Sequence, residues 1–330
     1  MLDFAGKRWY YLWFSMIFFT AAAIALAIPP HLKPGIEFTS GSSFTEKFDN
    51  PVAQADLRDE FSKLGFKDVT IQGAGTNTYL IRTRTLQGAP ALGSATAGPT
   101  QGGEIDSVEA ALRQRFGTLT RTDFSTVSSS VSSQIVQDAT LAVIVAAIAI
   151  LLYIAFAFRH LHKPFHFGAC AVIALAHDAF VILGLFSILG KLFNTEVDTS
   201  FIVALLTVIG FSVHDTIVVF DRIRENIQAD PFIPFEEAVN ASLTETLTRS
   251  INTSFVVVLT VLSMLLIGGV TIRNFLIVLL VGVISGTYSS IGIASQLMVA
   301  WENDDFGKFF RRITGRKERA KVDVDAAEPA

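Results

Sequence analysis

Six long apolar runs constrain this chain of 330 residues more than any other feature of its sequence. They cover residues 9–28, 141–158, 167–189, 201–220, 251–267 and 275–299. About 20 apolar residues in a helix cross the roughly 30 Å hydrocarbon layer of a membrane, so each run predicts one transmembrane helix. The mean hydropathy of +0.48 exceeds that of ordinary soluble chains but is too low for a chain surrounded by lipid throughout. We expect a polytopic α-helical membrane protein that also carries a soluble domain.

The first apolar run has two interpretations, a cleaved signal peptide or a retained anchor. Lys7 and Arg8 precede it, but Pro29 and Pro30 follow it and no small-x-small cleavage site is present there. Its start is rich in the aromatic residues typical of a membrane interface, namely Trp9, Tyr10, Tyr11 and Trp13. We therefore expect a retained anchor.

The charges between the runs predict the topology. The connection at residues 159–163 is basic, and so is the tail, with Lys308, Arg311, Arg312, Arg316, Lys317 and Arg319. Short connections on the other side carry Lys191 and Arg273. Because positive charge stays on the cytoplasmic side, we expect both termini inside and residues 31–137 outside. The net charge of −4 provides no basic surplus that would favour nucleic acid as a partner.

Residues 31–137 have the polar and apolar alternation of a folded soluble domain. The patterns predict strands at residues 36–48, 69–72, 77–83 and 119–131 and helices at residues 52–64 and 105–116, with Asn50 capping the first helix and Pro51 in its first turn. This order, βαββαβ, suggests a ferredoxin-like domain. Residues 87–103 are rich in Gly, Ala, Pro and Thr, and we expect a mobile loop there.

The predicted organisation divides the chain into four parts. Residues 1–30 hold the N-terminal segment and the first helix, residues 31–137 the exterior domain, residues 138–300 the other five helices, and residues 301–330 the cytoplasmic tail. Residues 221–248 are polar and form a cytoplasmic loop, in which Pro231 and Pro234 break the fourth helix. A short amphipathic helix at residues 235–247 is expected to lead into the fifth span.

Three ionisable residues within the apolar runs point to function, because a charge inside the membrane costs at least about 2.5–3.5 kcal/mol. Asp178 is expected near mid-membrane, and Asp215 in the cytoplasmic half of the fourth span. Arg249 stands at the cytoplasmic start of the fifth span, where it can reach Asp215 or extend to lipid phosphate. The alternative is structural, since each acid could tie its helix to a neighbour.

Polar side chains accompany these charges. They are Ser212, His214 and Thr216 around Asp215, and Ser250, Asn252, Thr253 and Ser254 after Arg249. Because residues three and four apart share a helix face, Arg249, Asn252 and Thr253 form one polar stripe. Such a stripe suits a path for protons or water.

Other chemistries fit the sequence less well. His177 beside Asp178 and His214 beside Asp215 could suggest a metal site, but adjacent residues point about 100° apart and helical metal motifs space their ligands by three or four. The residues before Asp215 lack the Gly-x-Gly-Asp context of intramembrane aspartyl proteases. We expect no metal ion, no cofactor and no enzymatic activity.

Two further features indicate packing. The single cysteine, Cys170, lies in an apolar run and is expected to be a small core residue. Gly282 and Gly286 have the four-residue spacing that lets two helices approach closely, and we interpret them as a packing surface.

Several segments resemble the SecF family. They are VHDTIVVFDRIREN at residues 213–226, LTRSINTS at residues 247–254, FAGKR at residues 4–8, GIEFT at residues 35–39 and GTYSS at residues 286–290. They occur in the family's order and together extend over most of the chain. The resemblance implies half of an RND-type transporter core, in the bacterial cytoplasmic membrane.

The resemblance also implies a function. SecF pairs with SecD and assists the SecYEG translocon in exporting unfolded proteins, with the proton gradient as the energy source. In that family the acid at the position of Asp215 and the arginine at the position of Arg249 belong to a proton-conducting network, which an acid of SecD completes. We assign Asp178, His214, Asn252 and Thr253 to the same expected pathway.

Some alternatives stay open. This chain has His214 where family members often have Asn, and this histidine either titrates near neutral pH or replaces Asn as a neutral hydrogen-bonding group. It also has Glu37 in place of Asp, and Ser40 with Gly41 in place of two glycines. The alternative function is an RND-like exporter of lipids or small molecules, although such exporters carry larger exterior domains and usually twelve spans.

Overall fold

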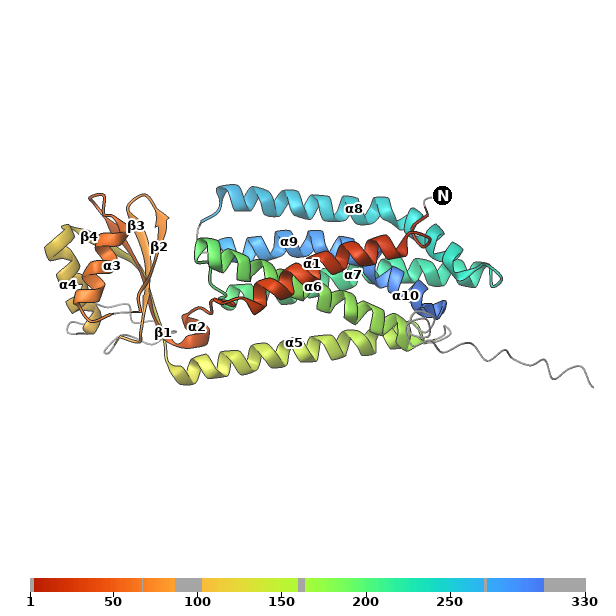
Figure 1. The fold of residues 1–330 in the computed structure, drawn as a ribbon, viewed down its shortest axis with the longest axis horizontal. Helices are drawn as coiled ribbons and strands as arrows, with labels where there is room; N and C mark the ends of the chain where they lie inside the picture. The colour runs from red at the N-terminus through yellow and green to blue at the C-terminus, as the bar shows by residue number, and fades with distance from the viewer. Residues whose placement is uncertain (1–2, 67, 87–102, 160–163, 270–271, 306–330) are drawn as a thin grey trace, which may run out of the picture.

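The computed structural model describes residues 3–66, 68–86, 103–159, 164–269 and 272–305. Within these residues, six helices are long and apolar enough to cross a membrane, which confirms the predicted number of spans. They are α1 (Arg8–Ala27), α5 (Ser129–Ala157), α6 (Pro164–Phe193), α7 (Thr199–Ala229), α8 (Phe235–Ile267) and the rod of α9 (Arg273–Ser289), η2 (Ser290–Ala294) and α10 (Ser295–Glu302). They form an elongated bundle with a small domain of strands and helices at one end (Figure 1).

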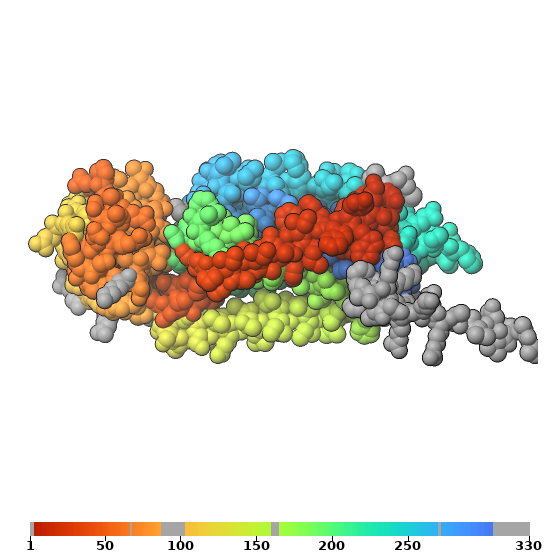
Figure 2. Space-filling view, viewed as in Figure 1, coloured from red at the N-terminus to blue at the C-terminus, as the bar shows by residue number. Residues whose placement is uncertain are grey.

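The helices differ in how deeply they lie in the bundle. In an apolar segment of 18 residues, half of the residues of α7 are buried inside the protein. The corresponding share is 6% for α5 and 17% for α8. α5 and α8 lie on opposite sides of the bundle (Figure 1), and α1 runs obliquely across the face turned to the viewer in Figure 2. α7 and α9 are therefore central, whereas α5 and α8 present much of their surface to the surroundings.

The predicted packing surface of Gly282 and Gly286 is confirmed, and it faces α7. A Cβ atom on Gly282 would lie 2.2 Å from Cγ2 of Val208, and one on Gly286 would lie 2.9 Å from Cβ of Ser212. Neither glycine could carry a side chain without moving α7 away. This close approach brings the polar residues of the two helices together.

The small domain is ferredoxin-like, as predicted. Its elements are α2 (Ile36–Thr39), β1 (Gly41–Phe48), α3 (Gln54–Lys63), β2 (Thr70–Gly75), β3 (Thr78–Thr83), α4 (Glu104–Phe116) and β4 (Leu119–Val127). The strands form one antiparallel sheet in the order β2-β3-β1-β4. Each helix thus connects two parallel strands that have an antiparallel strand between them.

The two faces of this sheet have different surroundings. α3 and α4 cover one face, and the other face is turned toward the bundle (Figure 1). The covered face holds the domain core, which includes Phe44, Phe48, Leu57, Phe61, Ile71, Ile81, Ile105, Val108 and Leu112. Burial of each such side chain contributes about 1.5–3 kcal/mol, so the domain has a substantial core of its own.

Residues 36–48 do not form one strand, contrary to the prediction. Residues 36–39 form the helical turn α2, and the strand begins at Gly41. Ser40 (φ 63°) and Gly41 (φ 142°) turn the chain between them, and a Cβ atom on Gly41 would lie 2.5 Å from the Thr83 carbonyl oxygen. The alternation was misleading because Ile36 is buried in the turn as it would be in a strand.

The predicted cap of the first domain helix is also wrong. α3 begins at Gln54 after Ala53, and no side chain caps it. Val52 stays outside the helix because its side chain is buried in the domain core and its carbonyl oxygen accepts a hydrogen bond from the Tyr79 hydroxyl. Asn50 therefore lies too early to cap α3.

The last strand is shorter than predicted, and the second membrane helix is longer. β4 ends at Val127, and Ser128 caps α5 by accepting a hydrogen bond from the Val131 amide at 3.4 Å. α5 therefore begins within residues 31–137, well before the apolar run that predicted it. A serine cap favours this early start, because it satisfies one of the free amides of the first turn.

The helices on either side of Pro231 and Pro234 follow the predicted pattern. α7 continues to Ala229, Pro231 and Pro234 lie in the turn that follows, and residues 235–247 form the first turns of α8. The expected mobile loop at residues 87–103 lies, apart from Gly103, outside the described residues. The same holds for residues 160–163 and for the basic tail from residue 306 onward.

Candidate functional site

Asp178 lies at the centre of the bundle, and hydroxyl groups of two other helices surround its carboxylate. Ser212 of α7 donates to Oδ2 at 2.9 Å, and Ser289 of α9 donates to the same oxygen at 2.6 Å. Ser285, one turn earlier on α9, donates to Oδ1 at 2.7 Å. Asp178 is only 1% exposed. Its carboxylate therefore joins α6 to α7 and α9.

His177 extends this network to α1. Its Nδ1 lies 3.3 Å from Oδ1 of Asp178, and its Nε2 lies 2.9 Å from the Ser15 hydroxyl. A neutral imidazole fits both contacts, because the protonated nitrogen can donate to the carboxylate while the other nitrogen accepts from serine. The histidine thus links α1 to Asp178 on α6.

Asp215 forms a second buried carboxylate site. It lies on α7 and is 8% exposed. Ser250 of α8 donates to its Oδ1 at 2.6 Å, and Ser290 donates to its Oδ2 at 2.6 Å. Ser290 begins η2, a π-helical segment, and single π-helical turns are frequent at functional sites. Asp215 therefore joins α7 to α8 and to the end of α9.

The two carboxylates belong to one polar layer. Ser212 precedes Asp215 by three residues on α7, so the two side chains share a face of that helix. Ser289 donates to Asp178 and its neighbour Ser290 donates to Asp215. Among the described residues, no hydrogen bond joins the two carboxylates directly, as an aspartyl dyad would. A continuous polar layer thus crosses α6, α7, α9 and α8 inside an apolar bundle.

The hydroxyl groups suit an acid that changes its protonation state. A serine hydroxyl donates to a carboxylate and can accept from a protonated carboxyl group, so both states keep their hydrogen bonds. In the part of the chain that the structure describes, neither acid forms an ion pair with an arginine or lysine, and no three His, Cys, Asp or Glu side chains lie together as in a metal site. Neutral hydroxyl groups therefore supply the hydrogen bonds of both acids.

The other predicted site residues point outward. Arg249, Asn252 and Thr253 on α8 and His214 on α7 are all exposed. The side chain of Arg249 forms no ion pair or hydrogen bond within the described residues, so the structure does not bring it to Asp215. Ser250 takes that place, because adjacent residues on a helix point about 100° apart. The predicted stripe of Arg249, Asn252 and Thr253 does lie on one face of α8.

Sequence reasoning named Ser212 and Ser250 near the acids but missed three other serines that hold them. Ser285 and Ser289 are four residues apart and Ser290 follows, so they form a polar patch on one side of a long apolar run. That spacing is a detectable signal. In the same run, Gly282 and Gly286 were interpreted as a packing surface, because small residues favour close contact between membrane helices.

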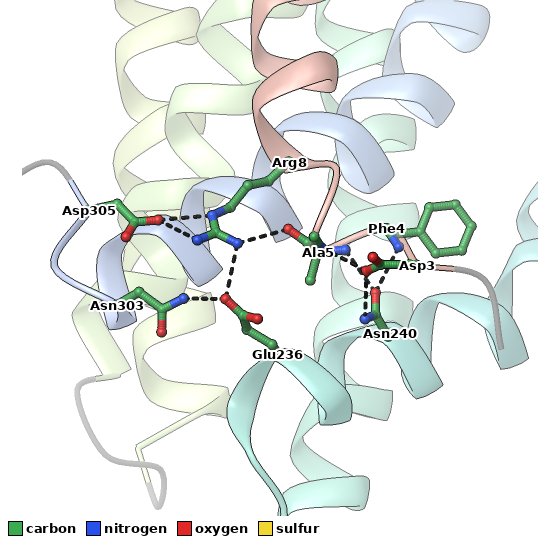
Figure 3. A network of polar contacts seen from close by, with 9 residues as sticks. Asp3, Phe4, Ala5, Arg8, Glu236, Asn240, Asn303 and Asp305 are labelled. Atoms are coloured by element: carbon green, nitrogen blue, oxygen red, sulfur yellow. Dashed lines mark hydrogen bonds and ion pairs between the residues drawn. The ribbon is translucent and has the colours of Figure 1, made fainter. Parts of the chain in front are cut away.

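A second polar network lies at the end of the bundle away from the ferredoxin-like domain (Figure 1 and Figure 3). The Arg8 guanidinium contacts Asp305 through Nε at 2.9 Å and Nη2 at 2.7 Å, and it contacts Glu236 through Nη1 at 3.0 Å. Asn303 also donates to Glu236. The carboxamide oxygen of Asn240 accepts from the amides of residues 4 and 5 at 2.9 and 2.8 Å. The N-terminal segment is thereby tied to α8 and to the residues that follow α10.

The chain matches a family model. The model described as "Protein export membrane protein SecD/SecF, C-terminal" matches residues 107–304. A protein translocase subunit SecF of Thermobaculum terrenum is 42% identical over 315 residues, which are 94% of this chain and 98% of the relative. The SecF of Anaerolinea thermophila is 39% identical over 94% of this chain and 98% of its own length.

Longer relatives contain a part similar to this chain. The protein translocase subunit SecDF of Bacillus subtilis is 34% identical over 93% of this chain, which spans 39% of that protein. The crystal structure of SecDF from Thermus thermophilus, described as a translocon-associated membrane protein, matches with a TM-score of 0.78 and 30% identity. That match covers 92% of this chain and 39% of the SecDF chain.

Proposed function

Because this chain belongs to the SecF family of protein translocase subunits, and so to bacterial protein export, we propose that the proton gradient drives its work and that it acts with SecD and the SecYEG translocon on unfolded proteins. It is a multi-pass membrane protein, and the family's role as a translocase subunit is not enzymatic. In this proposal both termini are cytoplasmic and the ferredoxin-like domain lies outside.

The observation that carries the proposal is the position of Asp215. Its carboxylate is buried between α7, α8 and η2, and the hydroxyls of Ser250 and Ser290 that donate to it are neutral. Loss of a proton leaves a negative charge inside the membrane, at a cost of at least about 2.5 kcal/mol. Protonation therefore changes the stability of the contact among three helices, which is the property that a proton-driven rearrangement requires.

The gradient supplies enough free energy for modest movements. A charge that crosses a potential of 100 mV releases about 2.3 kcal/mol. This amount is comparable to the cost of exposing or breaking a few buried hydrogen bonds. Repeated protonation of Asp215 from one side and its release to the other can thus drive a cycle of helix movements.

The exposed stripe on α8 supports SecD as the partner. Arg249, Asn252 and Thr253 are exposed on α8, a helix in which only 17% of the residues of the apolar 18-residue segment are buried. Polar and charged groups on such a surface are unfavourable in lipid, and a second half of the transporter would cover them. The SecDF relatives, of which this chain spans 39%, contain the additional length for such a half.

Arg249 has a defined role in this proposal. It is adjacent to Ser250, the residue of α8 that donates to Asp215 at 2.6 Å. A rotation of α8 by about 100° would exchange the neutral hydroxyl for a guanidinium group. A cation there favours the ionised acid and thus the release of its proton. Asp178 holds α6, α7 and α9 together while this exchange occurs.

The test is the variant Asp215→Asn in cells that lack the native chain. We expect it to abolish the part of export that depends on the proton gradient while the complex still assembles, because Asn keeps the hydrogen bonds but carries no titratable proton. The matched control is Asp138→Asn, which changes an exposed acid on α5 and should export normally. Normal, gradient-dependent export of a reporter protein by Asp215→Asn would show that the acid is structural.

A further inference from the structure

The connector after α1, the loop between α6 and α7 and the start of α9 meet at one place, which we call the joint. The connector after α1 runs beside the loop between α6 and α7, where Pro34 and Val197 form a parallel bridge. The Gly35 amide donates to the Val197 carbonyl at 2.7 Å, and the Val197 amide donates to the Lys33 carbonyl at 2.7 Å. Backbone hydrogen bonds thus fasten the entry to the exterior domain onto the start of α7.

The exterior domain reaches the same loop through its sheet. Arg82 of β3 forms an ion pair with Glu196 at 2.6 Å, and the two side chains are only 16% and 8% exposed. Gln72 of β2 donates to the carbonyl of Asn194. Arg82 and Gln72 alternate with the core residues of their strands, so they lie on the sheet face that is turned toward the bundle.

The loop passes these contacts on to the helices of the acid site. Asp198 caps α7 by accepting from the Phe201 amide at 2.8 Å. Asn274, in the first turn of α9, donates to the Glu196 carbonyl at 3.1 Å and to Asp198 at 3.3 Å. The residue that binds Arg82 is therefore also bound to the helix that carries Ser289 and Ser290.

We propose that the ion pair of Arg82 with Glu196 couples movements of the exterior domain to α7 and α9, and thereby to the hydrogen bonds of Asp215. Arg82 and Glu196 are positioning residues in this scheme, because they act through α7 and do not touch the acid. The proposal rests on the proposed function, since it takes Asp215 as the group that the proton gradient drives.

The geometry allows such coupling. α7 is one continuous helix, and Asp215 follows its first residue, Thr199, by 16 residues, or about 24 Å at 1.5 Å per residue. A stiff helix that is fixed to the domain at one end carries a displacement to the carboxylate. At Gly282 and Gly286 the α9 backbone lies against α7, so a shift of one helix must be followed by the other.

Arg82 stabilises the ionised forms of Glu196 and Glu37 at the joint. Burial raises the pKa of Glu196, and Arg82 opposes that rise by charge and by hydrogen bonding. Burial also raises the pKa of Glu37 in α2, with Asp198 adding to the rise and Arg82 opposing it. Lys33 is the other cation that acts on Glu196. Without Arg82, the acids that converge on the joint lose the guanidinium that holds them together.

The test is a charge-reversal cycle in the full chain, expressed with its partners. Arg82→Glu and Glu196→Arg are each expected to lower gradient-dependent export about fivefold or more, the size of a typical coupling between sites. The double variant restores the opposite charges and should recover most of the export. The matched control is Arg84→Glu, which breaks the ion pair of Arg84 with Glu104 inside the exterior domain and should export normally.

Two readouts separate coupling from simple stability. Protease resistance of the exterior domain should be unchanged in the single variants, and the part of export that does not depend on the proton gradient should equal that of the wild type. If charge reversal unfolds the domain, the neutral double variant Arg82→Met with Glu196→Gln is tested in place of the charge-reversed variants. It should show the same loss of gradient-dependent export. Wild-type export by the single or neutral variants, or a double variant no better than the single ones, would overturn the proposal.

Asp215→Asn, tested in parallel, distinguishes the two proposals. Normal gradient-dependent export by Asp215→Asn contradicts the proposed function and with it the coupling. Loss of export in Asp215→Asn together with normal export in Arg82→Glu contradicts the coupling alone.

Discussion

A carboxylate inside a membrane protein needs hydrogen-bond donors, and serine supplies one with the least added volume. Asp178 has three serine donors from two helices, and Asp215 has two. Because each hydroxyl is neutral and can also accept, the donors do not impose one charge state on the acid. At the residue scale, both buried acids are thus held by neutral hydroxyl groups of neighbouring helices.

Another buried acid lies in the exterior domain. Glu46 of β1 is fully buried beside Glu109 of α4, which forms ion pairs with Arg121 at 2.9 Å and Arg113 at 3.5 Å. Burial raises the pKa of Glu46 to about 8, Glu109 adds to the rise, and Arg121 and Arg113 oppose it. The protonated form of Glu46 therefore fits the folded domain better than the ionised form.

This pKa predicts how the stability of the domain depends on pH. Because the folded value lies above the unfolded value of 4.5, the stabilisation is fully present below pH 4.5 and is lost as the pH rises toward about 8. The slope is at most about 1.4 kcal/mol per pH unit for one proton. Glu46→Gln should flatten this dependence and stabilise the domain most near pH 8. The measurement is hydrogen exchange of the domain amides in the full chain, corrected for the pH dependence of the exchange chemistry.

Asp59→Asn serves as the control, because Asp59 is an exposed acid on α3 of the same domain. Its pH dependence should follow that of the wild type. A Glu46→Gln domain that still loses stability between pH 5 and 8 as the wild type does would show that another group is responsible.

At the scale of elements, the polar layer depends on how closely α7 and α9 approach. Gly282 and Gly286 allow this approach, and Ser285, Ser289 and Ser290 lie on the same stretch of helix. The small residues and the serines therefore act together. The glycines set the distance between the helices, and the serines then reach the acids on α6 and α7.

Gly282→Ala tests this dependence. The added Cβ would meet Val208, a short branched side chain with little freedom to move, so we expect a loss of about 1–3 kcal/mol. Thermal unfolding in detergent should show a midpoint lower by a few degrees. Gly210→Ala on α7 is the control, because a Cβ there has no atom within 4 Å. It should be neutral or slightly stabilising, since alanine favours helices. Equal midpoints for the two variants would contradict the packing argument.

At the scale of the whole molecule, the two peripheral helices have different outer surfaces. α5 presents apolar side chains such as Leu152, which is 59% exposed, whereas α8 presents the polar stripe of Arg249, Asn252 and Thr253 beside exposed apolar side chains such as Phe255. α5 and α8 lie on opposite sides of the bundle (Figure 1). The polar stripe on α8 thus lies on the side of the bundle opposite α5 (Figure 1).

A photo-crosslinking amino acid at position 253 should therefore capture SecD in the membrane. The same group at position 152 on α5 should give mainly lipid adducts, because that surface is apolar. Mass spectrometry of the products identifies the captured chain. Equal capture of SecD from both positions, or none from position 253, would contradict α8 as the partner side.

Local patterns in the sequence determined the elements of this protein. Run length decided the six spans, because a membrane helix needs about 20 apolar residues wherever it lies in the bundle. Alternation and helical spacing decided the order βαββαβ. The charges in apolar runs singled out Asp178 and Asp215, because a buried acid is costly in any arrangement of helices.

Only the tertiary structure decided which residues surround those acids. Spacing places Arg249 and Ser250 on neighbouring faces of α8, but the rotation of the packed helix determines that Ser250 and not Arg249 meets Asp215. Ile36 likewise lies in a helical turn and not in the strand that local alternation predicted. The contact between Arg82 and Glu196 also depends on the packing of elements distant in sequence. A sequence specifies which face of an element is apolar or polar, whereas the neighbour of that face depends on how all the elements pack at once.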